Sequence, residues 1–169
     1  SGFSYTLGAG GVSTGSKSVL TVNLNRCIQY AVRNGRPYTE FLEDVVDRMH
    51  KFQLAYNENL KHLHSKGILP LFDAGYITMG RQYLTIGVNG LVEAAEFLGI
   101  EISDNPQYAA FVQDVLGIVE KYNKQYRTAD VLFNCEMIPA ENVGVKHAKW
   151  DREDGYIVPR DCYNSYFYA

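Results

Sequence analysis

Three short apolar segments rich in β-branched residues constrain the fold of this chain most strongly. They span residues 18–24, 83–88 and 131–136, and each has the length of a buried strand but is too short for a helix. Segments with helical periodicity separate or follow them. Strands that alternate with helices are typical of a largely parallel sheet buried on both faces, so the sequence predicts an α/β fold.

The longest helix is predicted from the spacing of apolar residues. Between residues 39 and 67, apolar side chains recur at three- and four-residue steps, which indicates one buried face. The residues of this predicted face are Leu42, Val45, Met49, Phe52, Tyr56, Leu60 and Leu63.

Two further helices are predicted from their boundaries. One spans residues 91–98 and ends before Gly99, and the other starts with Asn105 as its cap and continues to about residue 127. The remaining segments carry weaker patterns. Residues 70–75 indicate a loop or a short extra strand, residues 143–150 are compatible with a helix, and residues 156–159 indicate a final extended piece.

Composition excludes several classes of partner. The chain has 169 residues and a formal net charge of -3, without a run of Lys or Arg, which argues against binding to nucleic acid or to an anionic membrane. No apolar stretch approaches the roughly 20 residues of a membrane helix, and we expect a cytoplasmic protein. Cys27, Cys135 and Cys162 are too widely spaced for a zinc site of the CxxC type, so no metal site is expected.

We expect one domain over residues 1–169. The chain starts without Met and ends on an apolar segment, which indicates an internal piece of a longer protein.

Polar residues gather where the predicted strands end. Asn23 and Asn25 end the first strand, Asn89 follows the second, and Asn134 and Glu136 end the third. Ligands of parallel α/β folds bind at the carboxyl ends of strands, which predicts a shared site. The alternative is that these residues only form strand-to-helix turns and caps.

The third strand is followed by a second candidate site. Residues 137–142 are positioned to open a helix whose free amides face an anion such as phosphate, although Glu141 or Asn142 as a structural cap remains the alternative. Cys135 lies between two polar residues, but strand alternation directs it to the opposite face from Asn134 and Glu136. A buried, inert thiol is its alternative role.

Three blocks of sequence resemble the anaerobic, class III ribonucleotide reductases. Residues 14–16 and 19–26 read TGS and VLTVNLNR, similar to the family's TGS and VxTINLPR. Residues 85–95 read TIGVNGLVEAA, similar to GINGLxEAA, and residues 133–141 read FNCEMIPAE, similar to a strand that ends in PAE. The blocks occur in the family's order, but Asn25 replaces the family's proline.

The resemblance implies a ten-stranded α/β barrel of two antiparallel halves, in which a glycyl radical generates a thiyl radical for the reduction of ribonucleoside triphosphates. Asn23, Cys135 and Glu136 are then catalytic candidates. The implied substrate-binding residues are Thr14, Gly15, Ser16, Asn89, Pro139, Ala140, Glu141 and Asn142.

The resemblance also implies what this chain does not supply. The glycyl radical, the zinc site and the thiyl cysteine belong to other parts of the parent enzyme, so the isolated chain is expected to be inactive. Implied partners are the remaining reductase chain, a radical-SAM activating enzyme and a second subunit of a homodimer. Two alternatives stay open: a stand-alone α/β domain that binds a phosphorylated metabolite, and a fragment of another glycyl-radical enzyme.

Overall fold

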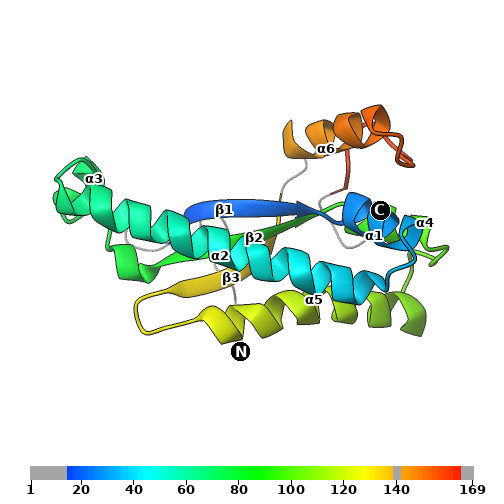
Figure 1. Cartoon of the computed structure of the whole chain (residues 1–169), viewed down its shortest axis with the longest axis horizontal. Coiled ribbons are helices and arrows are strands. Elements are labelled where there is room, and N and C mark those ends of the chain that lie inside the picture. The colour runs from blue at the N-terminus through cyan, green and yellow to red at the C-terminus, as the bar shows by residue number, and fades with distance from the viewer. Residues whose placement is uncertain (1–14, 139–141, 165–169) are drawn as a thin grey trace.

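The computed structural model describes residues 15–138 and 142–164, which form a parallel sheet with helices on both sides (Figure 1). The strands lie in the order β1-β2-β3, and their bounds are β1 (Gly15–Asn23), β2 (Gln82–Asn89) and β3 (Leu132–Met137). The helices are α1 (Leu24–Arg33), α2 (Tyr38–Ser65), α3 (Pro70–Asp73), the short 3-10 helix η1 (Met79–Arg81), α4 (Leu91–Phe97), α5 (Pro106–Tyr126) and α6 (Asn142–Glu153). The predicted α/β class is confirmed.

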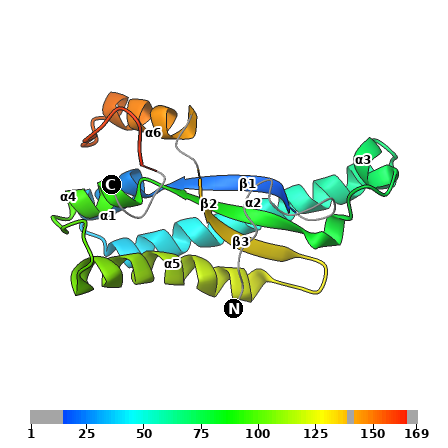
Figure 2. The ribbon, with the colours of Figure 1, turned by 180° about the vertical axis from the view of Figure 1, so that it is seen from behind.

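The helices divide into two layers. Figures 1 and 2 show α2 and α5 on one side of the sheet and α6 on the other, near the carboxyl ends of the strands. The main core fills the space between the sheet, α2 and α5, with α1 and α4 closing it at the carboxyl ends. Its fully buried members include Leu24, Ile28, Leu42, Val46, Ile86, Val88, Leu91 and Val115.

Most predicted elements are present. All three strands and the helices α2, α4 and α5 occur where the sequence placed them, and the segment after residue 141 forms α6. Residues 70–73 form the short helix α3, so the expectation of a loop or an extra strand is wrong there. Proline at the first helical position explains this turn. Residues 156–159 lie outside any helix or strand.

The buried face of α2 differs from the apolar face predicted for it. Phe52 is 70% exposed and Tyr56 is 45% exposed, whereas the polar residues His50 and Gln53 are buried. Burial of these polar side chains is possible because they are hydrogen-bonded: His50 contacts Asn123 Oδ1 at 2.7 Å, and Gln53 donates to the carbonyl of Thr85 at 2.8 Å.

Within residues 15–138 and 142–164, no helix combines the length and the apolar character that are needed to cross a membrane.

Candidate functional site

The two faces of the sheet differ in chemistry. The face toward α2 and α5 is apolar, with Val22, Ile86, Val88, Cys135 and Met137 packed in or against the core. Side chains alternate along each strand and the strands are in register, so the intervening residues share the opposite face. This second face, called the polar face below, carries Thr21, Asn23, Thr85, Gly87, Asn89, Asn134 and Glu136.

A chain of hydrogen bonds crosses all three strands on the polar face. The hydroxyls of Ser16 and Thr85 are 2.7 Å apart, and Thr85 Oγ1 donates to Asn134 Oδ1 at 2.6 Å. Asn134 Nδ2 then donates to Glu136 Oε1 at 2.9 Å. Thr85 is fully buried and Asn134 is 5% exposed. The carboxylate of Glu136 is therefore tied to a fixed polar network that begins on the edge strand.

Gly87 creates space in the middle of this face. A Cβ atom at this position would lie 2.5 Å from both Ile138 Cγ1 and Thr21 Oγ1, which is closer than atoms approach without displacement. The absence of a side chain in the central strand thus allows residues from β1 and from the end of β3 to meet over it.

The strand ends come together as the sequence predicted. Asn23 and Asn89 are direct partners in the register of β1 and β2. Both amides contact α6: Asn23 Nδ2 lies 2.9 and 3.0 Å from the two carboxylate oxygens of Asp151, and Asn89 Oδ1 lies 3.0 Å from His147 Nδ1. Asn23 Oδ1 also accepts from the Arg26 amide and so caps α1.

Asp151 is the centre of the contacts that hold α6 over the strand ends. Its carboxylate is fully buried and accepts from Arg26 Nε at 2.6 Å and from the Tyr163 hydroxyl at 2.6 Å, in addition to Asn23. Burial and this hydrogen bond raise the pKa of Tyr163. Burial also lowers the pKa of His147, which favours a neutral imidazole beside Asn89.

The structure does not bring Cys135 to the polar face. Its thiol packs against the helix-side core, as strand alternation predicts, and burial raises its pKa to about 12. The catalytic role given to Cys135 stays a prediction, but this thiol lies on the opposite side of β3 from Asn134 and Glu136.

The other predicted substrate-binding residues are only partly described. Thr14, Pro139, Ala140 and Glu141 lie outside the described residues. Gly15 and Ser16 begin β1, so they lie at the opposite end of this strand from its carboxyl end. Ser16 belongs to the chain of hydrogen bonds on the polar face. Asn142 is the exposed first residue of α6.

Sequence reasoning missed two groups of the polar face and its surroundings. Thr85 carries no signal beyond its place in a buried strand, and its partner Asn134 was noted only as a strand-end residue. Asp151 begins the charged run of residues 151–154, and a charged run of this kind is typical of a solvated turn. A run of charges gives no sign that one member is fully buried.

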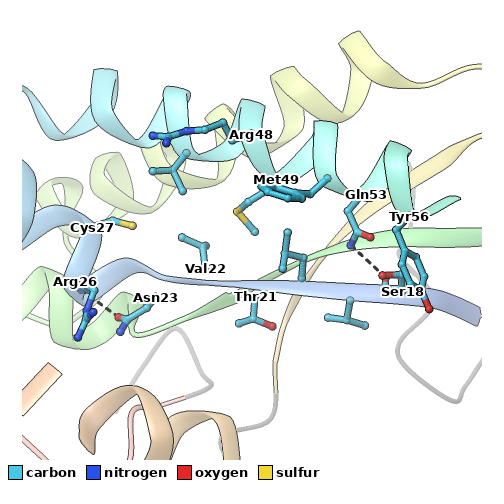
Figure 3. A pocket seen from close by; sticks show the side chains of 14 residues that line it. Ser18, Thr21, Val22, Asn23, Arg26, Cys27, Arg48, Met49, Gln53 and Tyr56 are labelled. Atoms are coloured by element: carbon cyan, nitrogen blue, oxygen red, sulfur yellow. Dashed lines mark hydrogen bonds between the residues drawn. The ribbon is translucent and has the colours of Figure 1, made fainter. Parts of the chain in front are cut away.

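A groove lies beside β1, between that strand, α1 and α2 (Figure 3). Its volume is about 650 Å³, and Val22 and Met49 point into the space between the strand and the helix, whereas Thr21 points away from α2. The exposed side chains at its rim include Val19, Leu20, Phe52 and Tyr56. Apolar surface of this kind is typical of a contact area for further protein.

In the described part of the chain, no three His, Cys, Asp or Glu side chains are grouped so that they could hold a metal ion.

Comparison with known proteins agrees with the resemblance in the three sequence blocks. The family described as "Anaerobic ribonucleoside-triphosphate reductase" matches residues 3–169. A comparison with curated proteins finds no match.

Several solved structures resemble this chain over most of its length. With the anaerobic ribonucleotide reductase from Thermotoga maritima with dATP bound in the specificity site, the identity is 30% and the TM-score is 0.83, covering 91% of this chain and 28% of that chain. For the same enzyme in complex with dATP and CTP, the identity is 31% and the TM-score is 0.83, covering 91% of this chain and 27% of that chain. For the same enzyme with citrate in the active site, the identity is 29% and the TM-score is 0.84, covering 96% of this chain and 32% of that chain. The chain therefore spans about a third or less of these proteins.

Proposed function

Because this chain belongs to the anaerobic ribonucleoside-triphosphate reductase family, we propose that it supplies part of the catalytic barrel of an enzyme that reduces ribonucleotides to deoxyribonucleotides. The observation that carries this proposal is the polar face, where Ser16, Thr85, Asn134 and Glu136 are hydrogen-bonded across three parallel strands. The comparisons do not favour a stand-alone metabolite-binding domain or another glycyl-radical enzyme.

The edges of the sheet support a larger barrel. β1 and β3 each pair on one side only within the described residues, and an unpaired strand edge is a template for further pairing. Val19 and Leu20 on β1 are 38% and 36% exposed, next to the groove under α2. We therefore propose that further strands and helices of the reductase continue the sheet here, toward the ten-stranded barrel of the family.

In a barrel with helices outside, the face away from α2 and α5 becomes the inner surface. The polar face would then meet the substrate, with Asn23 bonding the ribose and Glu136 close to the reacting carbon atoms. The segment from Pro139 to Asn142 would hold the phosphates. Asn23 already donates to Asp151, so the ribose would share this amide with a buried carboxylate.

The substrate and partners follow from the family. The Thermotoga maritima enzyme has been solved with dATP and CTP, which supports a ribonucleoside triphosphate as the ligand of this protein. The glycyl radical, the zinc site, the activating enzyme and a homodimeric partner would all act through parts of the protein outside this chain. For that reason we propose that the chain alone does not reduce ribonucleotides.

Asn23→Ala in the reductase that contains this chain tests the site. Asn23 caps α1, so loss of the cap should lower the free energy of unfolding by about 1 kcal/mol. Loss of the hydrogen bonds to Asp151 should lower it further. If Asn23 also bonds the ribose, turnover of ribonucleoside triphosphate falls roughly a hundredfold or more, well beyond the loss expected from partial unfolding.

Asn105→Ala is the matched control. Asn105 caps α5 by accepting from the Tyr108 amide at 2.8 Å, and α5 lies on the other side of the sheet from the polar face (Figure 1). Its loss should therefore lower stability without reducing turnover. Equal activity of the two variants at a temperature where both are folded would remove the support for a substrate contact by Asn23.

A further inference from the structure

We propose that Thr85 is a positioning residue of the reductase site, because its hydroxyl fixes the Asn134 amide, which in turn holds the Glu136 carboxylate. This inference rests on the function proposed above, in which the polar face is the substrate side of the sheet. Thr85 itself is fully buried and acts only through its two neighbours.

The first step is the orientation of the amide. An asparagine side chain has two orientations related by a flip, and its hydrogen-bond partners decide between them. Thr85 donates to the amide oxygen at 2.6 Å, and the amide nitrogen donates to Glu136 at 2.9 Å. In the flipped orientation, the amide oxygen of Asn134 would face the carboxylate oxygen, and two acceptors repel each other.

The second step is the direction of the hydroxyl chain. Thr85 has a single hydroxyl hydrogen, and when it bonds Asn134, the Thr85 oxygen can only accept from the Ser16 hydroxyl at 2.7 Å. The one Ser16 hydrogen also lies within reach of the Ser18 carbonyl at 2.9 Å, so Ser16 divides its hydrogen between these two acceptors. From Thr85 onward the donors point one way, through Asn134 toward the Glu136 carboxylate. Hydrogen bonds aligned in this manner strengthen one another in a site shielded from water.

The third step concerns the shielding of the Asn134 amide from water. Asn134 is 5% exposed, so water does not readily replace a lost donor at its amide oxygen. Glu136 has three side-chain torsions, and a side chain of this length is held in one position only by its contacts. Removal of the Thr85 hydroxyl would therefore loosen the Asn134 amide and weaken the hydrogen bond that it donates to the Glu136 carboxylate.

Two substitutions separate the hydroxyl from the shape of the side chain. Thr85→Val keeps the volume and the strand preference but removes the donor, whereas Thr85→Ser keeps the donor. In the full-length reductase, we expect Thr85→Val to lower kcat about tenfold, as for the loss of one buried hydrogen bond, with KM changed less than about twofold. Thr85→Ser should restore kcat to within about threefold of the wild type.

A double-mutant cycle with Glu136→Gln tests whether Thr85 acts through the carboxylate. We expect Thr85→Val to have no further effect on kcat in the Glu136→Gln background. Thr128→Val is the stability control, because the Thr128 hydroxyl accepts from two turn amides before β3. Its removal should lower the stability of the protein and leave kcat unchanged. Crystal structures of the two Thr85 variants should show a displaced Glu136 carboxylate or a flipped Asn134 amide only with valine.

The outcomes distinguish this proposal from the function on which it rests. An unchanged kcat in Thr85→Val while Glu136→Gln is inactive, or additive effects in the cycle, would overturn the positioning role alone. If Thr85→Val and Glu136→Gln both keep full turnover although the structure of Thr85→Val shows a displaced Glu136 carboxylate, the positioning contact stands and the catalytic role of the polar face fails. Unchanged positions of Asn134 and Glu136 in the valine structure would overturn the proposal whatever the activity.

Discussion

At the scale of single residues, Gly87 shows how closely the polar face is packed. Its added Cβ would meet Thr21 and Ile138, and both side chains are β-branched and stiff. Overpacking of this kind costs about 1–3 kcal/mol, so Gly87→Ala should lower the free energy of unfolding by that amount in urea titrations.

Gly117→Ala is the control for Gly87→Ala. Gly117 lies in α5, and a Cβ atom there meets nothing within 4 Å. Alanine should therefore stabilise the protein by about 0.5–1 kcal/mol through its higher helix propensity. The steric account of the polar face would fail if the two substitutions shifted stability in the same direction.

The two partly buried thiols that pack against the core, Cys27 and Cys135, give a prediction about pH. Burial raises the pKa of Cys27 and of Cys135 to about 12 from an ordinary value of 9.0, and nearby carboxylates add to the shift. A raised pKa keeps the thiol neutral, so at pH 8 only roughly one molecule in ten thousand carries the thiolate, compared with about one in ten after unfolding.

Alkylation by iodoacetamide at pH 8, followed by mass spectrometry, measures this difference. Cys27 and Cys135 should react roughly a thousandfold more slowly in the native protein than in the denatured protein. The unfolded state loses its thiol protons first as pH rises above 9, so these cysteines also make the fold less stable at alkaline pH. Native labelling of Cys135 at the denatured rate would contradict its packing against the helix-side core.

At the scale of secondary-structure elements, α6 is attached to the rest of the chain mainly by polar contacts of Asp151. Asp151 and Asp154 both bind Arg26 at 2.6 Å, but Asp151 is fully buried and Asp154 is 57% exposed. Asp151→Ala leaves several donors without an acceptor and should cost about 2–4 kcal/mol. Asp154→Ala removes an exposed ion pair and should change little.

Hydrogen exchange reports this difference locally. Amides of α6 should exchange roughly tenfold faster or more in Asp151→Ala, while those of α5 keep their protection. The same exchange rates in the Asp151 and Asp154 variants would show that other contacts hold α6 in place.

The elements also show where sequence patterns succeed. Strands buried on both faces and helices with clear caps were predictable, because local composition determines where the strands occur and capping residues determine where the helices begin and end. Helix α1 was missed as a separate element, since its ten residues begin directly after β1 with no loop between them. The buried face of α2 was misjudged because Gln53 and His50 are buried through partners distant in the sequence.

At the scale of the whole molecule, the family and the parallel sheet were predictable, whereas the inner network was not. The three sequence blocks correspond to β1, to β2 with α4, and to β3, so they mark the sheet and its carboxyl ends. The hydrogen bond from Thr85 to Asn134 joins residues 49 positions apart, and the one from Asn23 to Asp151 joins residues 128 positions apart. No local pattern in the sequence encodes such pairs.

The central claim is that the substrate side of this protein is the polar face and not the helix-facing side of the same strand. Neighbouring residues of β3 test it most directly: Glu136→Gln and Cys135→Ala in the full-length reductase, assayed for turnover of ribonucleoside triphosphate. We predict a loss of kcat of roughly a hundredfold or more for Glu136→Gln and a change of less than about threefold for Cys135→Ala. A reversed order of these effects would contradict the account.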